Sequence, residues 1–170
     1  MKLLIVFVLI LPALNAYGNS FQLVSSNSIK DEKVEKIFRE VEDALPVLMK
    51  DSFDDPIILD AESEKSKGTI FHQVALAYDI ENESSHQPQF ENITGWMNKG
   101  VFLKKRVNLN KFLDRSPDPL EMQSREETFA VNFKFFMTDP NFICHRPSYY
   151  KYYSELFKIQ PFKDHSCKIN

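Results

Sequence analysis

The sequence has little glycine and no strong excess of either charge. Only 4 of its 170 residues are glycine. They form no Gly-rich phosphate loop and no dinucleotide fingerprint, which excludes the nucleotide enzymes that depend on those motifs. The net charge is −3, and basic residues are scattered among acidic ones. The chain therefore offers no electrostatic footprint for nucleic acid.

One long apolar run is present, and it stands at the N-terminus. It extends from Leu3 to Leu11, follows the basic Lys2 and precedes Pro12 and small residues, which is typical of a secretory signal peptide. The alternative is a retained membrane anchor. The run is shorter than the roughly 20 residues that span a bilayer, which argues against that alternative. We expect residues 1–18 to be the signal peptide and residues 19–170 to be a single periplasmic or secreted domain without a membrane span.

Cysteine is also scarce, because the chain has only Cys144 and Cys167. Export to an oxidising space makes a disulfide the expected state of an even pair. A metal-binding or nucleophilic role is the alternative, but neither cysteine stands in a CxxC pair. His145 follows Cys144 directly, and sequence neighbours rarely point at each other.

Hydrophobic periodicity predicts helices in four segments and one short strand. Behind a capping signature at Ser28, apolar residues recur at helical spacing until Pro46, which should kink or end the first helix. An apolar run at residues 56–59 predicts a strand. Further helices are expected at residues 69–79, 124–137 and 147–157, with a loop and short elements at residues 80–119. We therefore expect an α+β fold that is mostly helical.

Residues 71–79 read FHQVALAYD and look like a damaged zinc-binding helix. In an intact HExxH motif, two histidines one turn apart ligate zinc, and the glutamate after the first acts as general base. Here His72 holds the first ligand position, Gln73 the base position and Leu76 the second ligand position. An amide takes no proton from water near neutral pH, and leucine has no donor atom. The structural alternative is a core histidine without a metal role.

Several blocks of the sequence, taken in order, resemble one family. They read GTIFHQVALAYD, ITGW, DRSPDP, EETFAVNFKFFMTDP and CHRPSYYKYYSELF, and a late cysteine follows. The chain resembles an uncharacterised family of bacterial envelope proteins that are built like zinc metallopeptidases. The resemblance extends from about Thr69 to Cys167 and implies a zincin-like domain.

This resemblance also implies roles for individual residues. It makes His72 the surviving histidine ligand and Glu127 a ligand from a later helix, but zinc needs at least three protein ligands. Lys134 stands where relatives often have glutamate. The differences from the family pattern, at Gln73, Leu76 and Lys134, are therefore concentrated at the metal site. The residues expected to support the site from behind, or to orient its helices, are Asp79, Asn132 and Asp139.

These features predict an exported zincin-like protein that has lost zinc-dependent hydrolase activity and acts as a binding or accessory protein in the cell envelope. No cofactor is expected, and the partner would be an envelope protein or peptide. One alternative is an atypical metal-dependent hydrolase in which His72, Glu127 and a substitute such as His86 or His165 hold zinc. Another is a purely structural envelope component.

Overall fold

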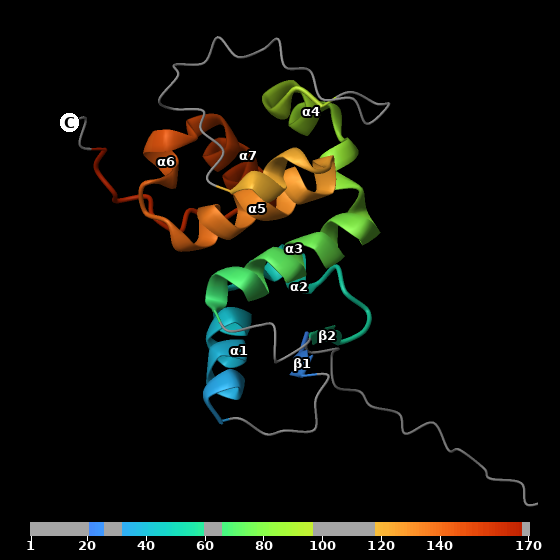
Figure 1. The fold of residues 1–170 in the computed structure, drawn as a ribbon. Coiled ribbons are helices and arrows are strands. Elements are labelled where there is room, and N and C mark those ends of the chain that lie inside the picture. The colour runs from blue at the N-terminus through green and yellow to red at the C-terminus, as the bar shows by residue number, and fades with distance from the viewer. Residues whose placement is uncertain (1–20, 26–31, 60–65, 97–117, 168–170) are drawn as a thin grey trace, which may run out of the picture.

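The computed structural model describes residues 21–25, 32–59, 66–96 and 118–167 (Figure 1). Within these ranges the protein is mostly helical and has one two-stranded sheet, which confirms the predicted α+β, mostly helical class. The predicted signal peptide and the capping residue Ser28 lie outside the described ranges. No helix in the described part of the chain is long and apolar enough to cross a membrane.

The four predicted helices are present. They are α1 (Glu32–Ala44), α3 (Lys67–Asn82), α5 (Arg125–Thr138) and α7 (Pro147–Phe157). Serine side chains cap two of them: Ser66 accepts a hydrogen bond from Thr69 N at 3.2 Å, and Ser124 accepts one from Glu127 N at 3.1 Å.

Proline marks two helix boundaries. Pro46 separates α1 from the short α2 (Val47–Lys50), and Pro147 is the first residue of α7. Both positions agree with the sequence prediction.

The small sheet pairs two segments that are distant in sequence. The predicted strand is β2 (Ile57–Leu59), and it pairs in parallel with β1 (Leu23–Ser25). Residues 80–96 and 118–146 add the short elements η1 (Ser84–His86), α4 (Pro88–Thr94), η3 (Pro119–Met122) and α6 (Phe142–His145). Periodicity did not predict β1, because three residues are too few to show it.

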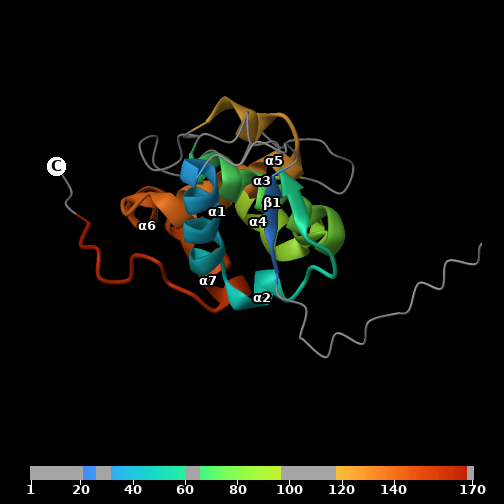
Figure 2. The same ribbon diagram turned by 90° about the horizontal axis from the view of Figure 1, so that it is seen from below.

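Helix α3 lies between two layers of the structure (Figure 1). On one side lie α1 and the sheet, and on the other lie α5, α6 and α7, while Figure 2 shows α1 and β1 from below, in front of α3. Most of the buried hydrophobic side chains form one cluster that includes Val41, Val74 and Phe133, each 0% exposed. Aromatic rings of α5 and α7 fill the centre of this core, many of them edge to face.

Candidate functional site

The seam between α3 and α5 contains the two residues that the resemblance pairs. His72 lies on α3 and is 7% exposed, and Glu127 lies in the first turn of α5, which Ser124 caps. His72 Nε2 lies 2.8 Å from Glu127 Oε2, within hydrogen-bond distance. The structure thus brings together two side chains that are 55 positions apart in the sequence.

The other two positions of the metal motif carry no suitable group. Gln73 is partly buried, and Leu76 is a partly buried side chain packed against the hydrophobic core. Leu76 therefore supplies methyl groups to the core, one helical turn beyond His72, where an HExxH helix would place its second histidine.

An ion pair flanks the His72–Glu127 contact. Lys134 Nζ on α5 donates to Asp118 Oδ2 at 2.7 Å, and Asp118 also caps η3 by accepting a hydrogen bond from Leu120 N at 3.0 Å. The hydrogen bond from Lys134 lowers the pKa of Asp118, and the charge of His72 contributes in the same direction. We call His72, Glu127, Asp118 and Lys134 the His72 cluster.

The donor set of this cluster does not fit a zinc site. Zinc sites in proteins use at least three protein ligands, and the described residues contain no group of three His, Cys, Asp or Glu side chains that could hold a metal ion. Of the two substitute ligands considered, His86 bonds Glu126 Oε1 at 3.0 Å and His165 bonds Asn141 Oδ1 at 3.0 Å. Both imidazoles are thus engaged with other residues.

The three residues expected to support the site lie in different places. Asp79 is buried at the end of α3, where its pKa is raised by burial, and the nearby Glu126 and His86 act on its charge. Asp139 ends α5 and accepts a hydrogen bond from Asn141 N at 2.9 Å. Asp139 is twelve positions beyond Glu127 along α5, about 18 Å along the axis.

Asn132 belongs to a second polar cluster, which the sequence analysis did not find. The Arg146 guanidinium donates to Glu121 and, at 2.6 Å, to Asn132 Oδ1. Asn132 Nδ2 donates to Glu121 Oε1 at 2.9 Å, and Tyr149 lies beside Glu121 and under the guanidinium. We call Glu121, Asn132, Arg146 and Tyr149 the Arg146 network; each of them is at most 7% exposed.

This network connects the two blocks that carry the resemblance most specifically. Asn132 comes from EETFAVNF on α5, and Arg146 follows Cys144 in CHRP. The available signal was Asn132, a polar residue between the apolar Val131 and Phe133, since a buried polar group needs a partner. The partner, Glu121, lies in a separate segment, and its identity required the structure.

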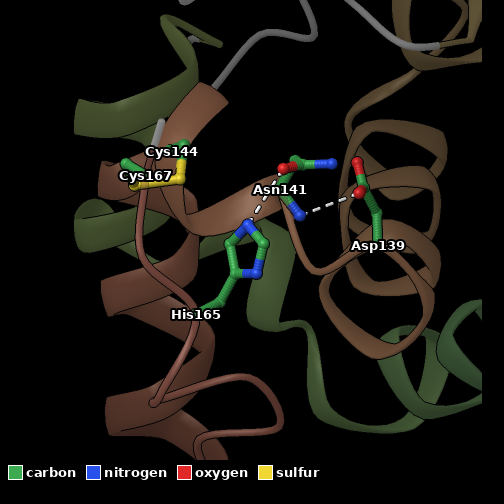
Figure 3. The surroundings of a disulfide bond; sticks show 5 residues. All are labelled: Asp139, Asn141, Cys144, His165 and Cys167. Atoms are coloured by element: carbon green, nitrogen blue, oxygen red, sulfur yellow. Dashed lines mark hydrogen bonds between the residues drawn. A yellow bond between two sulfur atoms is a disulfide. The ribbon is translucent and has the colours of Figure 1, made fainter. Parts of the chain in front are cut away.

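Cys144 and Cys167 form a disulfide, as predicted, with their Cα atoms 5.5 Å apart (Figure 3). Figure 3 also shows the His165–Asn141 and Asn141–Asp139 hydrogen bonds beside it. The bond and these contacts fasten the C-terminal segment to α6 and to the end of α5.

No curated protein and no solved structure matches the chain. A family model described as a domain of unknown function, DUF7844, matches residues 73–166, which is more than half of the 170 residues. The matched segment contains Glu127 and the whole Arg146 network. The chain belongs to the DUF7844 family.

Proposed function

We propose that this protein is an exported accessory domain of the cell envelope that acts by binding another protein or a peptide, and that its zincin-like metal site no longer supports hydrolysis. The observation that carries the proposal is the composition of the His72 cluster. Two potential ligands, His72 and Glu127, lie in contact, and the other acidic side chain of the cluster, Asp118, is paired with the ammonium group of Lys134.

Three residues, two on α3 beside His72 and one in the His72 cluster, oppose a metal-dependent reaction. Gln73 and Leu76 supply neither a general base nor a ligand. The Lys134 ammonium group already neutralises Asp118, and its charge would repel a second cation placed nearby. The His72 cluster is therefore satisfied by its own side chains, and this supports a role in binding over a role in hydrolysis.

Metal content separates this proposal from the atypical hydrolase. We expect the purified mature protein to hold less than stoichiometric zinc after dialysis, with a zinc content that the His72→Ala substitution leaves unchanged. His165→Ala is the matched control, because it removes a histidine outside the His72 cluster. Stoichiometric zinc that His72→Ala removes and His165→Ala leaves in place would overturn the proposal.

Restoring the motif tests whether α3 once carried a metal site. The double substitution Gln73→Glu with Leu76→His recreates HExxH on α3, and Glu127 lies opposite as the third ligand. We expect this variant to bind zinc in calorimetric titration, and the further change Lys134→Met to strengthen binding by removing a positive charge. If the restored variant binds no zinc, the assignment of this helix to a former metal site is wrong.

The binding role itself requires a partner from the envelope. Chemical cross-linking in an envelope extract, followed by mass spectrometry, should yield one recurring partner with cross-links at defined lysines. A protein that yields only scattered, unsaturable cross-links would instead support the structural alternative.

A further inference from the structure

Asp79 is a buried carboxylate at the point where α3 ends. It is 2% exposed, and its Oδ1 accepts a hydrogen bond from Ser85 N at 2.6 Å. Its other oxygen, Oδ2, is buried without a hydrogen-bond partner among the described residues. Burial raises the pKa of Asp79 by more than the hydrogen bonding of Ser85 lowers it, so the neutral form is favoured.

The charged groups around Asp79 strengthen this preference. Glu126 on α5 carries the same charge and disfavours ionisation of Asp79, whereas His86 on η1 acts in the other direction but is hydrogen-bonded to Glu126. The other titratable groups that face it are tyrosines, which stay neutral near pH 7: Tyr78 on α3, and Tyr152 and Tyr153 on α7.

The segment that Asp79 holds is short and depends on few contacts. Glu83 turns the chain with a left-handed backbone, φ 50°, before η1 begins. The Asp79–Ser85 hydrogen bond then fixes η1, together with a bond of 3.2 Å from the Tyr152 hydroxyl to Ser84 O and the His86–Glu126 contact of 3.0 Å. Short segments held by a few bonds open locally at lower cost than the core.

We propose that Asp79 and η1 form a pH-sensitive latch, which is held closed most firmly when the Asp79 carboxyl group is protonated and opens more readily as pH rises. Opening exposes Asp79 to water and separates His86 from Glu126. The inference does not depend on the lost metal site, because none of its contacts involves His72 or Glu127.

The sign of the effect follows from linkage. Burial raises the pKa of Asp79 in the folded protein above the ordinary value of 3.8. At pH values between the pKa of Asp79 in the open state and its raised pKa in the closed state, the closed state binds more protons. Rising pH therefore favours opening. Each pKa unit by which Asp79 in the closed state exceeds Asp79 in the open state corresponds to about a tenfold change in the opening equilibrium across the titration.

Amide hydrogen exchange at Ser85 and His86 measures this opening directly. After correction for the intrinsic pH dependence of exchange, we expect protection in the natural protein to fall severalfold between about pH 4 and about pH 8. Asp79→Asn keeps an acceptor for Ser85 N and removes the charge, so its protection should be higher at neutral pH and constant over this range. Asp139→Asn is the control, because Asp139 also accepts a backbone N–H hydrogen bond near the end of a helix but is more exposed, and it should leave η1 unchanged.

A direct titration keeps the proposal testable if Asp79→Asn does not fold. The Asp79 carboxyl carbon, followed by NMR in the natural protein, should titrate with a midpoint above 3.8. A midpoint at or below this value would overturn the latch, as would protection of Ser85 and His86 that does not change with pH.

Discussion

Helix α5 supports two polar clusters that differ in burial and in the number of segments they join. The Arg146 network is almost completely buried and connects η3, α5 and the start of α7. The His72 cluster is more exposed, since the side chains of Glu127, Asp118 and Lys134 are 23%, 22% and 19% exposed.

This difference in burial determines which of the two clusters can accept substitutions without loss of the fold. A buried ion pair that loses one partner leaves an uncompensated charge, so Arg146 and Glu121 can change only together. The partly exposed pairs of the His72 cluster can be hydrated after a substitution, and such pairs contribute little to stability. Under the proposed function, a metal site at the His72 position could thus have lost its ligands one at a time while the fold persisted.

The largest expected effect is that of Arg146→Met, which leaves the Glu121 carboxylate buried without its cation. We expect a loss of about 3–5 kcal/mol in the free energy of unfolding, measured by urea denaturation. Glu127→Gln, which alters the His72 cluster instead, should cost less than about 1 kcal/mol. Adding Glu121→Gln to Arg146→Met should recover part of the loss; equal losses for Arg146→Met and Glu127→Gln would abolish the distinction between the clusters.

Removing the disulfide should have the next largest effect. Cys144 and Cys167 are 23 positions apart, and opening this loop by Cys144→Ser with Cys167→Ser should cost about 3 kcal/mol in the chain-entropy model. The bond fastens α6 directly before Arg146, so a double-mutant cycle should show coupling with Arg146→Met and none with Glu127→Gln. Additive losses in both cycles would show that the disulfide does not support the Arg146 network.

The local part of this structure could be predicted from the sequence. Helices α1, α3, α5 and α7 follow from apolar spacing together with caps and prolines, all of which act within a few residues. The Cys144–Cys167 bond could be predicted as well, because two cysteines allow one pairing. The contact between His72 and Glu127 followed only from the resemblance, since no periodicity relates residues on two separate helices.

The non-local part could not be predicted. The pairing of β1 with β2, the burial of Glu121 against Arg146, and the position of Asp79 beside Glu126 each depend on how α3 and α5 pack. Asp79 and Asp139 both read as polar residues that end a helix, yet one is buried and the other is partly exposed. Sequence spacing carries no information about this difference.

The smallest effect is expected at Lys134, and its pH dependence identifies its cause. Lys134→Met removes the ion pair with Asp118, which should cost about 0.5–1 kcal/mol near pH 7 because both side chains are partly exposed. The pKa of Asp118 is lowered by its hydrogen bond with Lys134, so the pair stabilises the fold above the ordinary value of 3.8 and is lost as pH falls through the lowered value. The difference in unfolding free energy between the natural protein and Lys134→Met should therefore shrink as the pH is lowered below 3.8. A difference that stays constant with pH would mean that Lys134 stabilises the fold through its stem beside Gly68 or through its ammonium group over the Phe135 ring, and not through the ion pair with Asp118.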